Sequence, residues 1–300
     1  MRESSNVVAG NNVQERSWKN VYLVRLVLIA GIMQTDQIMM VLLVTKTLGT
    51  SINGLFKMTL VTLLPLLVPV LLSAFFLYWA SIRFLERRSV HELRPIGAFQ
   101  QFTLGLGGAV LLFAIVFSAI ASSGNISYLG YTGLGSIPSS LLLYATGAVF
   151  EELIFRGALF RITEEACGTG PALIISALCF GVSHLANTGV TLFSVLSIAV
   201  GSTVFCLAYS LTKSLWCSIG IHLGWNLAQG ALFGAAVSGH ASQGIFRFML
   251  AGPDWLTGGA FGPEASVFSI ILFGALAGVL GWLTIRRRSW SKTKLRITAS

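Results

Sequence analysis

Residues 138–160 read PSSLLLYATGAVFEELIFRGALF, an apolar run that contains two adjacent glutamates and an arginine. A helix needs about 20 mostly apolar residues to span the hydrocarbon core of a bilayer. Glu151, Glu152 and Arg156 therefore fall inside a predicted span, where ionisable side chains are costly and usually serve a function. This stretch predicts a membrane helix that carries part of a reactive site.

The rest of the chain has the composition of a membrane protein. Charged residues make up 10% of the 300 residues, hydrophobic residues make up 54%, and the mean hydropathy is +0.78. Soluble domains contain about 25% charged residues, so this chain cannot cover its surface with solvated groups. The net charge of +9 comes from basic residues in the tails and between apolar runs. This placement argues against a nucleic-acid partner and favours a lipid bilayer.

Apolar runs of suitable length predict an all-α bundle of about eight transmembrane helices. The predicted spans are 21–45, 58–82, 100–122, 138–160, 171–187, 190–212, 215–238 and 265–285. Gln34, Asp36 and Gln37 lie near the middle of the first run, so the sequence leaves open whether 21–45 forms a full span.

Basic residues divide unequally between the two sides of this arrangement. If the N-terminus lies inside, fifteen of the twenty Lys and Arg residues fall on the cytoplasmic side. The positive-inside rule then predicts that both termini are cytoplasmic. We expect a transmembrane protease domain at 21–285 with its motif core at 138–238. A cytoplasmic N-terminal tail (1–20) precedes it, and a basic cytoplasmic tail (286–300) follows it.

The two adjacent glutamates are expected to differ in role. Glu152 and Arg156 stand four residues apart, share a helix face and can form an ion pair. Glu151 points about 100° away and has no such partner in its own helix. A packing ion pair with a snorkelling glutamate is the alternative, but Glu151 lies about 16 Å from the cytoplasmic end of its span. We expect Glu152 and Arg156 to support the site and Glu151 to act as an acid or base.

Three further polar residues lie in the apolar runs that follow. His184 comes four residues after Phe180, and His222 comes four residues before Asn226. Taken singly, each could be a packing residue or a hydrogen bond between helices. At about 1.5 Å per residue from the cytoplasmic ends, however, His184 lies about 20 Å deep, Asn226 about 16 Å and His222 about 10 Å, so they can meet Glu151 in one layer. The sequence therefore predicts one polar cluster near the middle of the membrane.

Such a cluster can hydrolyse an amide without a serine or cysteine nucleophile. A carboxylate and an imidazole can hold and deprotonate one water molecule, and a second histidine with an amide can stabilise the oxyanion. Glu151, His184 and His222 could instead bind zinc, although HExxH is absent. We favour a site without a metal.

The motifs EExxxR (151–156), FxxxH (180–184) and HxxxN (222–226) occur in this order, each in a predicted span. The chain thereby resembles the CPBP family, which comprises CAAX proteases and bacteriocin-processing enzymes. The resemblance implies a catalytic cavity inside a helical bundle of a prokaryotic plasma membrane. It also implies that Glu151 activates water with His184, and that His222 and Asn226 form the oxyanion site. Members of the family have been described both as metalloproteases and as metal-independent glutamic proteases. We therefore expect a glutamic-type intramembrane endopeptidase.

Two other functions remain open. Intramembrane Glu and His also build the proton relays of transporters, although no internal repeat is visible. A non-catalytic immunity or scaffold protein could use the same fold. If the chain is a protease, we expect a membrane-embedded or membrane-associated peptide or protein as its substrate.

Overall fold

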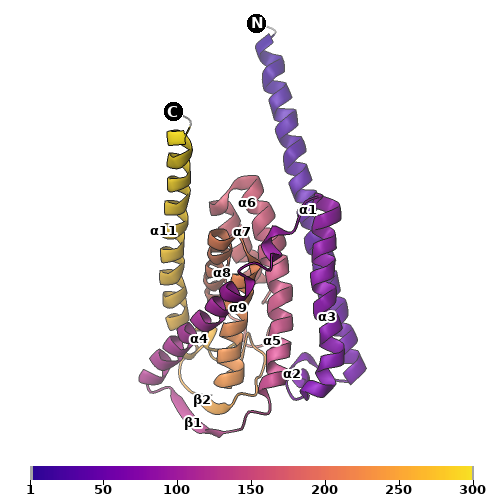
Figure 1. The fold of residues 1–300 in the computed structure, drawn as a ribbon. Coiled ribbons are helices and arrows are strands. Elements are labelled where there is room, and N and C mark those ends of the chain that lie inside the picture. Colours follow the sequence, from indigo (N-terminus) through magenta and orange to yellow (C-terminus); the bar gives the residue numbers. More distant parts are fainter. Residues whose placement is uncertain (1–2, 299–300) are drawn as a thin grey trace.

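The computed structural model describes residues 3–298, and it describes the side chains of residues 21–287. The chain forms a bundle of helices with a small sheet at one end (Figure 1). The α-helices are α1 (Glu3–Leu48), α2 (Ile52–Leu55), α3 (Leu60–Ser81), α4 (Ala98–Ser122), α5 (Ile137–Glu152), α6 (Arg161–Cys167), α7 (Thr169–Val182), α8 (Leu192–Thr212), α9 (Leu215–Asn226), α10 (Asp254–Thr257) and α11 (Val267–Thr298). The other elements are the π-helices η1 (Ile82–Glu86), η3 (Leu153–Phe160) and η4 (Leu227–Leu232), the 3-10 helices η2 (His91–Leu93) and η5 (Pro263–Ala265), and the strands β1 (Ile126–Tyr131) and β2 (Phe246–Leu250).

Six helical segments of the described chain are long and apolar enough to cross a membrane. They are Val21–Leu48, Leu60–Glu86, Ala98–Ser122, Ile137–Cys167, Leu192–Thr212 and Val267–Arg287. The predicted all-α membrane bundle is thereby confirmed, and residues 21–45 lie within a helix of sufficient length. The other two predicted spans contain shorter helices, because α7 ends at Val182 and the helix formed by α9 and η4 ends at Leu232. The count of eight spans stays a prediction.

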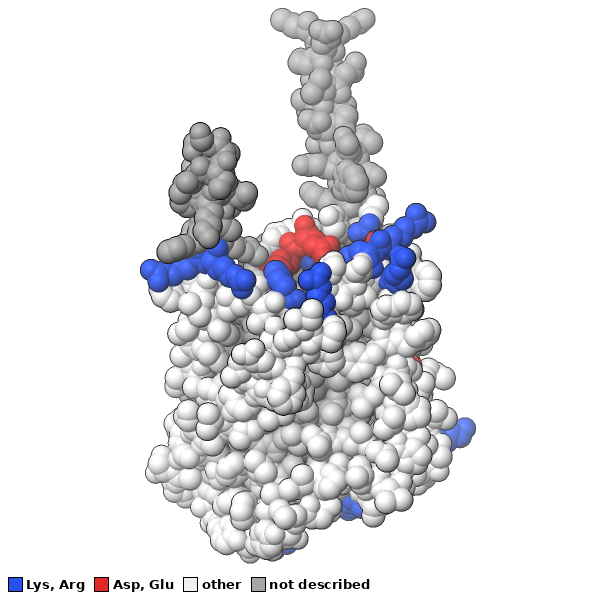
Figure 2. Space-filling model, in the orientation of Figure 1, with Lys and Arg blue, Asp and Glu red and all other residues white. Residues whose placement is uncertain are grey.

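Charge is concentrated at one end of the bundle. Figure 1 shows α1 and α11 extending from the same end, and Figure 2 shows most of the blue and red side chains in a band there. Ion pairs within this band join Arg161 to Glu86 at 2.6 Å and Lys213 to Glu164 at 2.8 Å. The cytoplasmic orientation and the domain limits stay predictions, and residues 1–2 and 299–300 of the expected tails lie outside the described residues.

Helix α9, which carries His222 and Asn226, lies very close to α4. A Cβ atom at Gly220 would stand 2.3 Å from the carbonyl oxygen of Phe102, and one at Gly224 would stand 2.4 Å from that of Leu106. Small residues allow membrane helices to approach in this way, so their backbones come into contact. This contact fixes how α9 presents its polar residues to the interior.

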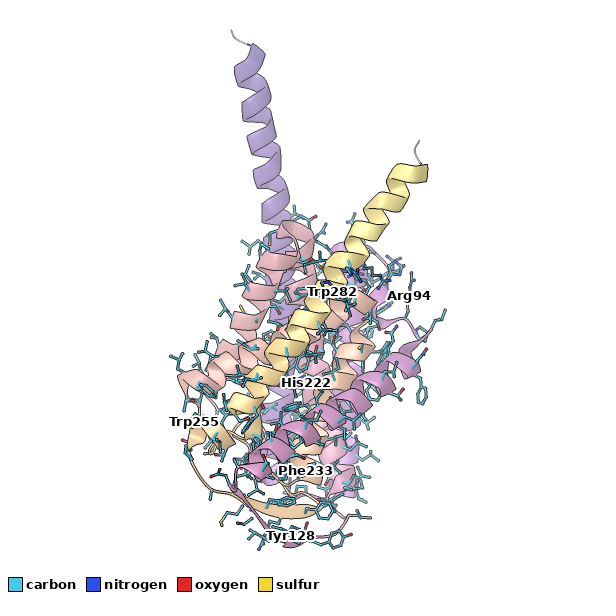
Figure 3. All side chains as sticks on the ribbon, turned by 90° about the vertical axis from the view of Figure 1, so that its left-hand side faces the viewer. Arg94, Tyr128, His222, Phe233, Trp255 and Trp282 are labelled. Carbon is cyan, nitrogen blue, oxygen red and sulfur yellow. The ribbon has the colours of Figure 1, made fainter. Side chains whose placement is uncertain are left out.

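Strands β1 and β2 form an antiparallel ribbon, with Ile126 opposite Leu250 and Tyr131 opposite Phe246. Figure 3 shows Tyr128 at one end of the molecule, Arg94 near the other, and His222 between them. The ribbon therefore closes the end of the bundle opposite the charged band. The segment between η4 and β2 folds back towards the interior, where residues 237, 238 and 240 line a cavity.

Candidate active site

A cavity of about 470 Å³ lies among α1, α5, α9 and the turn that follows α7. It is lined by all four residues predicted to be catalytic: Glu151, His184, His222 and Asn226. These residues come from α5, from the turn after α7 and from α9, so the tertiary fold brings them together as expected. Their chemical roles depend on the contacts that each side chain makes.

The Glu151 carboxylate has an unused oxygen atom. Its Oε2 is buried and has no hydrogen-bond partner within the described part of the chain. Nε2 of His222 lies 3.7 Å from Oε2 of Glu151. This separation is too long for a direct hydrogen bond, but both atoms could contact one water molecule. Glu151 is thus available for chemistry, as its place on the helix predicts.

Glu152 makes the ion pair that the sequence predicts and a second contact that it does not. Its Oε1 lies 3.0 Å from Nη1 of Arg156, and both side chains are fully buried. The same oxygen lies 3.0 Å from Nδ1 of His222. Glu152 therefore links the supporting arginine directly to a predicted catalytic histidine. Helix periodicity could not predict this link, because the two residues lie on different helices.

The guanidinium group of Arg156 contacts two aromatic rings and two oxygen atoms of one serine. It lies 4.5 Å from the ring centre of Phe180 and 4.8 Å from that of Phe205. Its Nη2 donates to the hydroxyl of Ser202 at 2.6 Å and to the carbonyl of Ser202 at 3.1 Å. Two aromatic faces and two oxygens thus compensate for the burial of a cation. Phe205 also stacks on the ring of His222, with the two ring centres 5.3 Å apart.

His184 lies outside the helix in which the sequence places it. Helix α7 ends at Val182, and His184 occupies the turn that follows. The prediction of a span to residue 187 was therefore wrong for its last turn. The helix ends there because Nδ1 of His184 and the hydroxyl of Ser183 both bond to the carbonyl of Phe180, at 2.8 Å and 2.7 Å. The predicted proximity of Phe180 and His184 is confirmed, with ring centres 4.9 Å apart.

The hydrogen bonds of the two histidines assign their protons. A carbonyl can only accept, so Nδ1 of His184 carries hydrogen and donates to Phe180. By the same reasoning, Nδ1 of His222 donates to the carboxylate of Glu152. In the neutral ring, each Nε2 then carries a lone pair. Each Nε2 can therefore accept a hydrogen bond.

Several cavity residues were absent from the predicted site. Asn187 and His240 line the cavity, and so do Gln34 and Gln37 from α1. Nδ1 of His240 lies 3.0 Å from Oδ1 of Asn53, in the short helix α2. Burial, reinforced by the nearby His184, lowers the pKa of His240 below its usual range, so its ring is neutral at pH 7. His240 follows the last motif in a predicted loop, and no spacing pattern marks it.

The zinc alternative needs three ligands that converge. Within the described part of the chain, no group of three His, Cys, Asp or Glu side chains could hold a metal ion. Glu151, His184 and His222 line one cavity but do not form such a group as they are arranged. The preference for a site without a metal stays a prediction.

The site coincides with a recognised family segment. Residues 134–228 match the family model described as type II CAAX prenyl endopeptidase Rce1-like. The comparison with curated proteins and the comparison with solved structures each gave no match. The matched segment contains all six residues singled out in the three motifs, and the apolar helices around it make the chain an integral, multi-pass membrane protein. The part of the cavity lined by residues 143–226 therefore lies in a segment similar to the Rce1-like CAAX prenyl endopeptidase family, as the motifs had indicated.

Proposed function

We propose that the chain is an intramembrane endopeptidase in which Glu151 activates the water that attacks the scissile carbonyl. The observation that carries this proposal is the buried, unpartnered Oε2 of Glu151, which faces Nε2 of His222 at 3.7 Å. The atom lies in the segment matched by an endopeptidase family model and beside a cavity of about 470 Å³. A peptide that crosses or enters the bilayer is the substrate that this position in the bundle suits.

The proposed reaction begins with water held by Glu151 and His184. Glu151 takes a proton as the water oxygen attacks the carbonyl, and negative charge develops on the carbonyl oxygen. The amide of Asn226 donates to that oxygen. The proton then passes to the leaving nitrogen, and the peptide bond breaks.

His222 can assist the oxyanion only in its protonated form. Its Nδ1–H is engaged by Glu152, so a neutral ring offers a lone pair, and only an imidazolium can donate from Nε2. The buried Glu152 carboxylate lies 3.0 Å from Nδ1 of that ring and fixes its orientation. We infer that Glu152 prepares His222 as an oxyanion donor, a role beyond the supporting ion pair expected from the sequence.

The test compares the wild-type protein with Glu151→Gln, both purified in detergent, on a panel of internally quenched peptides with apolar centres. Hydrolysis should fall by at least ~10², because general-base catalysis is typically worth ~10²–10⁴. The variant should keep its thermal unfolding profile. Activity within about tenfold of wild type would refute the role of Glu151.

A second arm of this test separates the glutamic mechanism from the zinc one. If the water is held by side chains alone, hydrolysis should survive exhaustive chelation, and zinc analysis should give far less than one equivalent. A zinc enzyme would lose activity on chelation and regain it with added zinc. That result would overturn the metal-free mechanism and leave the endopeptidase assignment in place.

A further inference from the structure

Helix α1 forms part of the wall of the cavity that the predicted catalytic residues also line. It contributes seven lining residues, of which five are apolar and two are Gln34 and Gln37. These glutamines lie in a segment, Val21–Leu48, that is long and apolar enough to cross the membrane. Uncharged amides in such a segment are costly unless their hydrogen bonds are satisfied.

Asp36 lies between the two glutamines in sequence, but its hydrogen-bond partner is in another helix. Asp36 is 8% exposed and accepts a hydrogen bond at 3.2 Å from the hydroxyl of Ser73 in α3. The polar group that faces α3 thus has a partner within the fold. Gln34 is exposed and Gln37 is half-buried; both line the cavity and bond to each other, with Nε2 of Gln34 donating to Oε1 of Gln37 at 3.2 Å.

This mutual bond leaves complementary groups available. The carbonyl of Gln34 can still accept, and the amide nitrogen of Gln37 can still donate two hydrogen bonds. A peptide unit offers the matching pair, an N–H and a C=O. A substrate helix must unwind locally before its scissile carbonyl can reach Glu151, and unwinding strips nearby main-chain groups of their partners. In a membrane each such group needs a replacement partner.

We propose that Gln34 and Gln37 form a subsite that binds the main chain of a locally unwound, apolar substrate segment, in the cavity that Glu151 also lines. The inference rests on the proposed endopeptidase function and specifies its substrate class. The apolar α1 residues around the pair would contact the apolar side chains of that segment. The glutamines would form hydrogen bonds with the main-chain groups that lose their helical partners. Because they bind the main chain alone, they would not discriminate between substrate side chains.

The test uses Gln34→Met/Gln37→Met, because methionine keeps the length of glutamine and removes its polar groups. The change makes α1 more apolar, so insertion into the membrane is not impaired. The double change is added to Glu151→Gln, and binding of fluorescent apolar peptides is measured by anisotropy. The Kd of the tightest-binding peptide should rise about tenfold, as expected for two neutral hydrogen bonds. Gln100→Met is the matched control, since Gln100 is exposed on α4 and outside the cavity, and it should change nothing.

A second measurement tests recognition of the main chain itself. Peptides in which one amide is replaced by an ester lose a single N–H donor. At one position the ester should weaken binding to the Glu151→Gln protein and have no further effect when both glutamines are methionine. Equal Kd values with and without the glutamines would overturn the subsite, and so would a failure of every peptide to bind. If binding depends on the glutamines but the wild-type protein cleaves nothing, the subsite stands and the endopeptidase proposal fails.

Discussion

Glu152 receives hydrogen bonds from both Arg156 and His222, so its substitutions should act on stability and on chemistry. Glu152→Ala strands the buried Arg156 and should cost about 3–5 kcal/mol. Glu152→Gln/Arg156→Met removes both charges and should recover most of that stability. It should not recover kcat, because the Nδ1–H of His222 loses the carboxylate that it contacts. Thermal unfolding and kcat between pH 5 and pH 9 check both statements.

Full activity in that double variant would mean that Glu152 serves packing alone.

The two contacts of Glu152 also show what the sequence can predict at the scale of the residue. The spacing of Glu152 and Arg156 within one helix was sufficient to predict their ion pair. The contact of Glu152 with His222 depends on how α5 and α9 pack, and no local pattern encodes that packing.

Glu264 is a buried carboxyl group that supports the cavity from behind. It accepts from the N–H of Ser238 at 2.5 Å and contacts the amide of Gln229, while Ser238 and its neighbour line the cavity. Burial raises the pKa of Glu264 from 4.5 to about 7. The folded state thus binds a proton more tightly than the unfolded state, and the resulting stability is complete below pH 4.5 and is lost as the pH rises through 7.

We therefore expect the unfolding free energy of the wild-type protein to fall by about 3 kcal/mol between pH 4.5 and pH 7.5 from this group. Glu264→Gln keeps the size of the side chain and cannot ionise, so its stability should depend less on pH over that interval. Thermal unfolding in detergent at a series of pH values measures the difference. Parallel curves for the two proteins would contradict this account.

The crossing of α4 and α9 makes a prediction at the scale of the element. Gly224→Ala places a methyl group where the carbonyl of Leu106 lies 2.4 Å away, so the helices must separate. We expect a loss of about 1–3 kcal/mol, as for other overpacked contacts. Activity should fall as well, because α9 carries His222 and Asn226. Gly107→Ala on α4 is the control, since its methyl group would meet nothing within 4 Å.

Hydrophobic runs predicted where helices lie more reliably than where they end. The sequence extended the fifth span to residue 187 and the seventh to residue 238, whereas α7 ends at Val182 and η4 at Leu232. At the end of α7, Ser183 and His184 bond to the Phe180 carbonyl, and composition does not reveal such contacts. Two π-helices, η3 and η4, begin directly after Glu152 and Asn226, and a 3.6-residue period cannot predict them.

At the scale of the molecule, both termini should lie on the same side of the membrane. Helices α1 and α11 leave the bundle at the end where the basic residues gather (Figures 1 and 2). Reporter fusions placed before Trp18 and after Lys294 should therefore both report the cytoplasm. Reporters on opposite sides would require an odd number of crossings and a different path for one helix.

The overall plan followed from composition and charge, but the ribbon at the far end did not. Strands β1 and β2 are separated in sequence by all the helices from α5 to η4, and each strand is short. Their pairing depends on the bundle bringing Ile126 opposite Leu250 and Tyr131 opposite Phe246. Gln34 and Gln37 were visible in the sequence only as an irregularity in an apolar run. Their significance became apparent once the cavity was seen beside them.

The cavity lining also bears on the direction of the reaction. Within the described residues, that lining includes the carboxylate of Glu151 but no lysine or arginine. Hydrolysis would create a second carboxylate, on the new C-terminus, next to the first. Two like charges in a poorly solvated space repel one another strongly. The acid product should therefore be expelled as it forms, so that cleavage is followed by departure and the severed ends are not rejoined.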